Sequence, residues 1–106
     1  MPPLSIDDET ASLYTVGQVA RILRVRQAFL RRLDEYEIVC PVRSSGGQRR
    51  YSRLEIRRVR HVVELASEGM TLIAIRRVLE LERRVTKLQA ERDAAVERAR
   101  SSRRYP

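Results

Sequence analysis

The sequence predicts a mainly α-helical fold in which two short helices, a small β-hairpin and a third helix precede one long C-terminal helix. Two observations lead to this prediction. Apolar residues recur at helical spacing over most of residues 16–100, and Ser or Thr precedes several of the predicted helices. Between two helical patterns lies RSSGGQRRYS, residues 43–52, whose glycines and arginines suit an exposed turn.

Composition limits the size of the core and the kind of partner. The chain has 106 residues, of which 34% are charged and only 5% are aromatic, so a small aliphatic core is expected and a partner chain would help it fold. The net charge is +8, and Lys87 is the only lysine among the 22 basic residues. Arginine binds phosphates and base edges with a planar fork of donors. This balance favours nucleic acid or an anionic surface as the partner.

Several classes of protein are not expected. The apolar runs are too short to span a membrane, and the N-terminus has no apolar stretch typical of a signal peptide. One histidine and one cysteine are little material for catalysis, so we predict no enzyme, no cofactor and no metal. His61 is expected on a helix surface or half-buried, and Cys40 as a small core residue that stays reduced.

Residues 14–35 predict the first two helices, after a flexible N-terminal tail at residues 1–13. Thr15 and Gln18 form a capping-box pattern, and the following apolar stripe is helical. A second helix is expected to start near Arg26, with its arginines facing outward. Two short helices joined by a tight turn are typical of a helix-turn-helix, although an ordinary helical hairpin with a solvated basic face has the same pattern.

A β-hairpin is predicted directly after this pair. The stretch IVCPVR is β-branched, the following SSGG supplies glycines for positive φ, and QRRYS follows. The hairpin would carry Arg43, Arg49 and Arg50 near its tip and Tyr51 at its base. Such a wing is too charged to bury, which favours an anionic partner, although a solvated arginine loop stays possible.

The last two helices follow from similar signals. Ser52 and Glu55 form a second capping box, Gly69 breaks the third helix, and Thr71 caps a fourth. The seam from Val78 to Ala99 alternates spacings of three and four residues, which predicts a coiled-coil dimer. A helix that folds back on its own domain is the alternative, and whether residues 71–100 form one helix or two is open.

This order of elements resembles the MerR family of bacterial transcription regulators over roughly residues 14–90. The resemblance rests on YTVGQVARIL, FLRRLDEYEIVCP, GGQRRYS and MTLIAIRRVLELE. SSGGQRRYS and IRRVLELE look most like the heat-shock repressor subgroup, which has a short tail in place of an effector domain. The resemblance implies a recognition helix in the major groove, with Arg31 at the family's arginine position. Arg49 and Tyr51 would fill the wing pattern that starts at Gly47.

The chain departs from the family pattern at several positions. Arg24 and Arg26 replace the usual Gly and the usual capping Ser or Thr, and Arg32 and Leu33 replace two aromatics. Glu37 replaces a glycine, so the second helix is expected to end without its left-handed glycine cap. The metal-binding cysteines of metal-sensing members are absent. Added arginine should preserve phosphate binding while shifting base preference.

The expected protein is therefore a winged helix-turn-helix transcription regulator, expected to be a repressor. Its domains would be residues 14–75 for DNA binding, 76–100 for dimerisation, and 101–106 as a flexible basic tail. The residues expected to contact DNA are Thr15, Arg26, Gln27, Ala28, Arg31, Arg32, Arg43, Gly47, Arg49, Arg50 and Tyr51. The residues expected at the dimer seam are Val78, Leu81, Val85, Leu88 and Ala95.

The expected partners are double-stranded DNA, bound at an inverted repeat, and a second copy of the chain. If the heat-shock resemblance holds, it implies a chaperone as co-regulator. A cytoplasmic, nucleoid-associated location is expected. An architectural DNA-binding protein of the recombination-directionality type and a coiled-coil adaptor are the alternatives.

Overall fold

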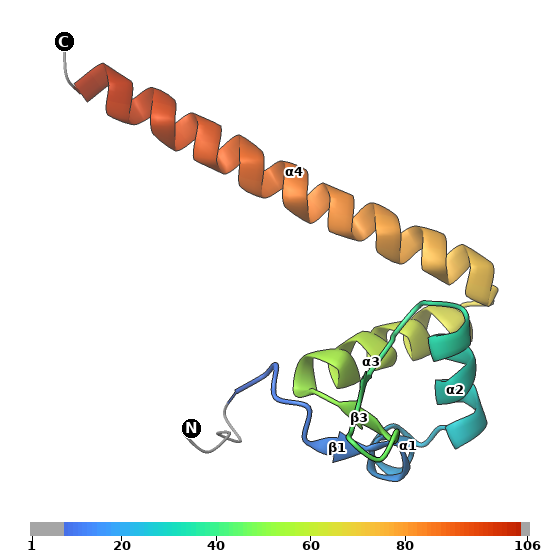
Figure 1. Ribbon diagram of the computed structural model, residues 1–106. Coiled ribbons are helices and arrows are strands. Elements are labelled where there is room, and N and C mark those ends of the chain that lie inside the picture. Colours follow the sequence, from blue (N-terminus) through green and yellow to red (C-terminus); the bar gives the residue numbers. More distant parts are fainter. Residues whose placement is uncertain (1–7, 105–106) are drawn as a thin grey trace. The chain divides into compact units, whose positions relative to one another are not determined.

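The computed structural model describes residues 8–104 of the chain (Figure 1). The elements in order are β1 (Tyr14–Thr15), α1 (Val16–Leu23), α2 (Gln27–Glu35), β2 (Val42–Arg43), β3 (Arg49–Tyr51), α3 (Arg53–Ser67) and α4 (Leu72–Arg104). The chain divides into two compact units, Met1–Arg76 and Arg77–Pro106. The predicted mainly helical fold, with its hairpin of strands and long C-terminal helix, is confirmed.

Both predicted capping boxes are present. The hydroxyl of Thr15 accepts a hydrogen bond from the amide of Gln18 at 3.1 Å, and the Gln18 side chain accepts from the amide of Thr15 at 2.8 Å. Ser52 and Glu55 make the same reciprocal pair at the start of α3, at 3.1 and 2.9 Å. These bonds satisfy amides that the first helical turn leaves without partners, which fixes where each helix begins.

Two charged residues end the first two helices in left-handed backbone conformations. Arg24 has φ of 55° after α1, and Glu37 has φ of 58° after α2. After α2, the amide of Ile38 donates to the carbonyl of Leu33 at 2.8 Å and the amide of Glu37 donates to Asp34 at 2.9 Å. This pair of bonds is a Schellman motif, which usually has glycine at the left-handed position. The expected glycine cap is indeed absent after α2, but the left-handed conformation is kept, because Glu37 itself adopts it.

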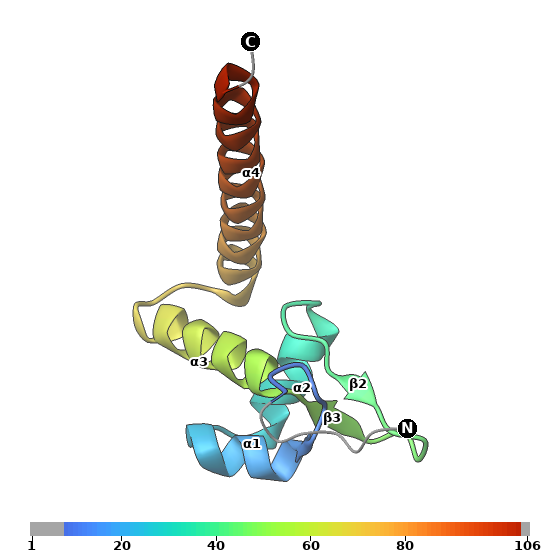
Figure 2. The same ribbon diagram turned by 90° about the vertical axis from the view of Figure 1, so that its left-hand side faces the viewer.

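The sheet has three strands rather than the two of the predicted hairpin. β3 lies in the middle and pairs antiparallel with β2 on one side and β1 on the other. Arg50 lies opposite both Thr15 and Val42, whereas Tyr51 lies opposite Tyr14. Figure 2 shows the hairpin of β2 and β3 beside α2. The extra strand ties the hairpin to the residues that start α1.

Glu9 binds α3, although the sequence predicted a flexible tail over residues 1–13. The carbonyl of Glu9 accepts from the amide of Leu54 at 3.1 Å, and its carboxylate binds Arg57. Ala11 is buried. The described part of the segment is thus held on the folded unit, while the rest of the predicted tail, residues 1–7, lies outside the described residues.

The core of the first unit is aliphatic with one tyrosine. Its buried apolar residues are Ala11, Val19, Ala20, Leu30, Leu33, Ile38, Val39, Tyr51, Ile56, Val59, Val62, Leu65 and Ile75. Four of them, Ile56, Val59, Val62 and Leu65, follow one another along α3 at a spacing of three residues, so one face of that helix is buried. α1, α2, α3 and the sheet are grouped around this core in Figure 2. The core fixes α2 and the hairpin as neighbours.

α4 is one continuous helix of 33 residues, which settles the question of one helix or two. The hydroxyl of Thr71 accepts from the amide of Ala74 at 3.1 Å, as the predicted cap requires. The helix continues to Arg104, so the described part of the expected basic tail is helical. Its large apolar side chains at Leu81, Val85, Leu88 and Val96 are exposed, as is Ala95, whereas Val78 is half-buried. Among the described residues, no helix is both long enough and apolar enough to span a membrane.

Candidate DNA-binding surface

A groove of about 410 Å³ opens beside α2 and the β2–β3 hairpin. Its lining residues are Thr15, Val16, Gln27, Arg31, Arg43, Gly47, Gln48 and Arg49. Six of these eight belong to the residues that the sequence marked as DNA contacts. Three arginines from α2, β2 and β3 therefore converge on one concave surface, which gives the groove a positive charge.

The exposed face of α2 supplies one side of this groove. Gln27 and Arg31 are four residues apart and both are exposed, whereas Leu30 and Leu33 are buried. Residues at this spacing lie one turn apart on the same helix face. The core thus holds the back of α2, while its amide and guanidinium groups are free to meet a ligand.

The first turn of α2 lacks a side-chain cap. Arg26 occupies the N-cap position with an extended backbone, and its side chain makes no capping hydrogen bond. A Ser or Thr there would satisfy an amide of the first turn, whereas an arginine side chain has no acceptor. The helix start therefore combines donor amides with a nearby guanidinium, a combination that favours an anion.

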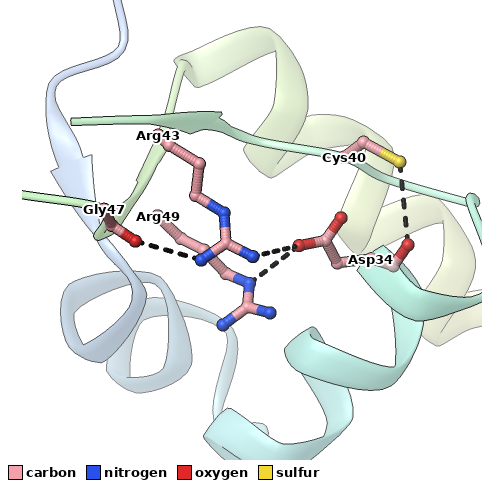
Figure 3. A network of polar contacts seen from close by, with 5 residues as sticks. All are labelled: Asp34, Cys40, Arg43, Gly47 and Arg49. Atoms are coloured by element: carbon pink, nitrogen blue, oxygen red, sulfur yellow. Dashed lines mark hydrogen bonds and ion pairs between the residues drawn. The ribbon is translucent and has the colours of Figure 1, made fainter. Parts of the chain in front are cut away.

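A polar network joins the hairpin to α2 (Figure 3). The Nε of Arg49 donates to Oδ2 of Asp34 at 2.8 Å, and a terminal nitrogen of Arg43 lies 3.4 Å from the same oxygen. The other terminal nitrogen of Arg43 donates to the carbonyl of Gly47 at 3.0 Å. Asp34 and Arg49 have side chains only 18% exposed. Arg43 and Arg49 are therefore partly engaged within the protein and are not freely solvated cations.

The hairpin turn depends on a glycine conformation. Gly47 has φ of 80°, and its amide donates to the carbonyl of Ser44 at 2.8 Å. The amide of Ser44 donates in return to the carbonyl of Gln48 at 2.7 Å. A Cβ at position 47 would meet no atom within 4 Å, so the backbone conformation rather than lack of space requires glycine here.

Tyr51, expected at the DNA surface, is instead a core residue. Its side chain is 1% exposed, and burial raises the pKa of its phenol to about 12. Its hydroxyl has no hydrogen-bond partner among the described residues. A side chain enclosed in this way cannot reach a ligand, so the expectation is corrected. Its neighbour Arg50 is half-buried on the central strand.

The remaining expected contacts lie around a second hollow. Ala28 and Arg32 are exposed on α2, and the guanidinium of Arg32 lies 6.0 Å from the centre of the Tyr36 ring. This hollow of about 420 Å³ is lined by Arg24, Val25, Arg26, Ala28, Phe29, Arg32, Val63 and Ala66. The predicted set is thus divided between the two sides of α2.

Cys40 and His61 are the only cysteine and the only histidine of the sequence. Cys40 is exposed, which corrects its expected place in the core, and its sulfur lies 3.8 Å from the carbonyl oxygen of Asp34. Partial burial of the sulfur raises the pKa of this thiol. His61 is half-buried on α3, with Nδ1 4.0 Å from Glu64. The described residues contain no group of three or more His, Cys, Asp or Glu side chains that could hold a metal ion.

Sequence reasoning missed Val16, Gln48 and Asp34 in this region. Val16 and Gln48 are neighbours of residues that were expected at the surface, so only their exact orientation was unknown. Asp34 lies three residues after Arg31 on α2, and its carboxylate binds Arg43 and Arg49 of the hairpin. An acid three residues after Arg31, and so on the same helix face as a groove arginine, is the signal that could have identified it.

The fold and the groove define a class of protein, the winged helix-turn-helix DNA-binding proteins. The sequence pattern of the MerR HTH family of regulatory proteins matches residues 14–82. This chain therefore belongs to the MerR family of DNA-binding transcription regulators. Its characterised relatives are regulators and not enzymes, in agreement with the prediction from the sequence.

Two groups of relatives illustrate the similarity. The chain is 35% identical over 89 residues to HspR of Streptomyces coelicolor, described as a heat shock protein, and this match covers 83% of the chain. It is 25% identical over 73 residues to the HTH-type transcriptional regulator GlnR of Bacillus anthracis and of Bacillus cereus, which covers 69% of the chain. The matches span only 58% of HspR and 57% of GlnR.

Solved structures share the fold. HiNmlR, a MerR family regulator lacking the sensor domain and bound to promoter DNA, has a TM-score of 0.60 at 21% identity, with 87% of this chain and 80% of that chain covered. The N-terminus of MtaN, the Bacillus subtilis multidrug transporter activator, has a TM-score of 0.60 at 24% identity, with 86% and 95% covered. A MerR family regulator from Bacillus cereus has a TM-score of 0.58 at 19% identity, with 78% and 73% covered.

Proposed function

We propose that this chain is a transcriptional repressor that binds an inverted-repeat operator in double-stranded DNA as a homodimer. The observation that carries the proposal is the groove in which Arg31 of α2 meets Arg43 and Arg49 of the hairpin. A helix with exposed amide and guanidinium groups suits base edges in the major groove, and a basic hairpin suits the flanking phosphates. The DNA-bound state of HiNmlR, which shares the fold, supports duplex DNA as the ligand.

In this proposal, α2 reads the sequence and the wing sets its position. Gln27 and Arg31 face the groove from adjacent turns and are the candidates for base contacts. Arg50, the uncapped start of α2 and the terminal nitrogens of Arg49 are candidates for phosphate contacts. Thr15, Arg26, Ala28 and Arg32 stay proposed contacts at the edges of this surface.

The second unit supports the proposed dimer. Leu81, Val85 and Leu88 have side chains 45%, 52% and 61% exposed, and they repeat at the spacing of a coiled-coil seam. A helix with such a stripe is stabilised when a second helix covers it. Pairing of two chains would present two copies of α2, which matches an operator with two symmetric half-sites.

The proposed repression and the proposed protein co-regulator have support of their own. They rest on the similarity to HspR, described as a heat shock protein, and on the resemblance of SSGGQRRYS to the heat-shock repressor subgroup. We propose a chaperone as the co-regulator and the cytoplasmic nucleoid as the location.

Mapping of the bound sites across the source genome, followed by titration of the recovered duplexes, tests the function. We expect an inverted repeat among those sites. Arg31→Ala should lose about 1–3 kcal/mol of discrimination between bases at one base pair of each half-site. Arg50→Ala should weaken binding to all duplexes and lower the salt dependence of the binding constant by about one unit of slope. Sites without a shared sequence would favour an architectural protein instead. An absence of duplex binding would refute the proposal.

A further inference from the structure

Asp34 is the point at which three structural elements meet. Its Oδ2 oxygen, on α2, accepts from Arg49 of β3 at 2.8 Å and lies 3.4 Å from a terminal nitrogen of Arg43 of β2. Arg43 continues the connection to the turn, since its second terminal nitrogen donates to Gly47 at 3.0 Å. Figure 3 shows these links running from the helix to both strands of the hairpin and to its turn.

The outer strand of the hairpin has few other supports. β3 also pairs with β1, but β2 has only two residues and pairs with β3 alone. Val42 is 59% exposed, so the outer strand contributes no apolar side chain to the core at that position. Tyr51 anchors the base of the hairpin in the core. The bonds to Asp34 are therefore the links that hold the arginine-bearing part of the hairpin against α2.

The bond to Asp34 also orients Arg49. This bond uses only Nε, and the two terminal nitrogens of Arg49 make no hydrogen bond or ion pair within the described residues. Arg49 lines the groove, so a guanidinium fixed through Nε can offer its remaining donors to a phosphate there. Because the Arg49 side chain is already ordered in the free protein, DNA binding has a smaller entropic cost.

A carboxylate beside this groove is unfavourable for a protein that binds a polyanion. Its charge repels nearby phosphates. If this repulsion were the only effect of Asp34, removal of the carboxylate would strengthen DNA binding. We propose that Asp34 is a positioning residue that fixes the wing and Arg49 relative to α2 in the geometry that DNA requires. This inference rests on the proposed function, and it predicts that removal of a negative charge weakens binding to DNA.

The test compares Asp34→Ala with Glu35→Ala in the full-length chain, with titration against a duplex from the mapped sites. Both variants remove one carboxylate from neighbouring positions of α2, and Glu35 is exposed. Glu35→Ala should bind with unchanged or slightly higher affinity. Asp34→Ala should bind about tenfold more weakly, as expected when a pair of charge-assisted hydrogen bonds no longer orients the contact. Binding by Asp34→Ala as tight as that by Glu35→Ala would overturn the inference.

A second comparison separates positioning from a general loss of stability. In a chain that already carries Arg43→Gln and Arg49→Gln, Asp34 has no wing arginine to position. Asp34→Ala should then strengthen binding, because only its repulsion of phosphate is left. A further tenfold loss in this background would show a merely structural role and would contradict the inference.

Hydrogen exchange of the DNA-free protein gives a measurement that does not depend on DNA affinity. Arg43→Gln breaks the link to the turn at a side chain that is 51% exposed, so the fold should survive. The amides of Ser44 and Gly47, which bond within the turn, should exchange several-fold faster than in the wild type, whereas amides of α3 should not change. Unchanged exchange at the turn would overturn the inference even if Asp34→Ala cannot be purified. Failure of the wild-type chain to bind any duplex would instead refute the proposed function.

Discussion

Arg57 on α3 and Glu9, 48 residues earlier, form a two-bond ion pair that holds the segment before β1. The terminal nitrogens of Arg57 donate to the two carboxylate oxygens of Glu9 at 3.1 and 2.9 Å. The backbone carbonyl of Glu9 accepts from Leu54 at 3.1 Å. The hydrogen bond and the charge of Arg57 lower the pKa of the Glu9 carboxyl below its ordinary value.

This pair predicts that the segment is released in acid. A carboxyl whose pKa is lowered by folding stabilises the folded form above its unfolded pKa, and the effect is lost as pH falls through the folded pKa. In an NMR titration, the amide of Leu54 should shift with a midpoint below 4.5. Glu9→Gln should abolish that titration while the α3 resonances distant from residue 54 keep their positions. A midpoint at or above 4.5 would contradict the pairing in solution.

Glu37 provides a stability test, because its left-handed conformation is unfavourable for a residue with a side chain. Glu37→Gly should raise the free energy of unfolding by about 0.5–1 kcal/mol, since relief of left-handed strain exceeds the added entropy of the unfolded chain. Glu35→Gly, two residues earlier and helical, should lower it by about 1 kcal/mol. Thermal unfolding followed by circular dichroism measures both. Destabilisation of both variants to the same extent would mean that position 37 is not left-handed in solution.

Tyr51 predicts a specific loss of stability in alkali. Its pKa of about 12 in the fold exceeds the ordinary value of 10, so the unfolded chain loses the phenolic proton first as pH rises. Stability should therefore fall between pH 10 and about 12, by an amount on the order of 2–3 kcal/mol. Tyr51→Phe should lack this fall and should be at least as stable at pH 7, because it removes a buried hydroxyl that has no partner among the described residues.

Tyr51→Phe also checks the corrected role of this residue. DNA affinity at neutral pH should equal that of the wild type, because the side chain is enclosed in the core. A loss of affinity together with unchanged stability would restore Tyr51 as a DNA contact.

Arg26 predicts opposite effects on stability and on DNA binding. Arg26→Ser should cap α2 and raise the free energy of unfolding by about 1 kcal/mol. The same change should weaken binding to all duplexes and lower the salt slope by about one, if the arginine neutralises a phosphate. Arg60→Ser, which removes an exposed arginine of α3 outside both hollows, is the charge control. Equal loss of DNA affinity in both variants would reduce the role of Arg26 to general attraction.

A substitution at Leu88 tests whether the C-terminal helix forms the dimer interface. Leu88→Lys would place a charge in the apolar seam, which costs several kcal/mol if a second helix covers that seam. The first unit should stay folded, because its buried residues end at Ile75. Sedimentation equilibrium should show monomers, and gel shifts should show weak binding to half-sites only. Ala90→Lys, two residues along the same exposed helix but off the seam, should stay dimeric. A dimeric Leu88→Lys variant would place the interface elsewhere.

Local signals predicted the helices of this protein well. A Ser or Thr with a Gln or Glu three residues later is a short-range pattern, and Thr15 and Ser52 cap their helices as that pattern requires. Apolar residues at helical spacing likewise indicated helices within residues 16–100, where α1, α2 and α3 lie. Each of these signals lies within one turn of helix and needs no knowledge of the rest of the fold.

Features that depend on distant residues were not predicted. β1 has only two residues, and it becomes a strand because β3 lies beside it. Glu9 finds a partner 48 residues away, and Asp34 finds one 15 residues away. The family pattern marked Tyr51 as important but could not tell whether it faces DNA or the core. Burial of Tyr51 depends on how the sheet packs, which no short stretch of sequence encodes.

The chemistry of the groove limits how its attraction for DNA can be tuned. Its three cations, Arg31, Arg43 and Arg49, are guanidinium groups, which stay protonated in proteins. Acylation of lysine therefore cannot discharge this surface, and neither can a change of acidity within the physiological range. The concentration of competing ions remains effective, because it alters the release of counterions from the duplex. Osmotic or ionic stress should thus shift occupancy of DNA by this protein in a way that lysine modification does not.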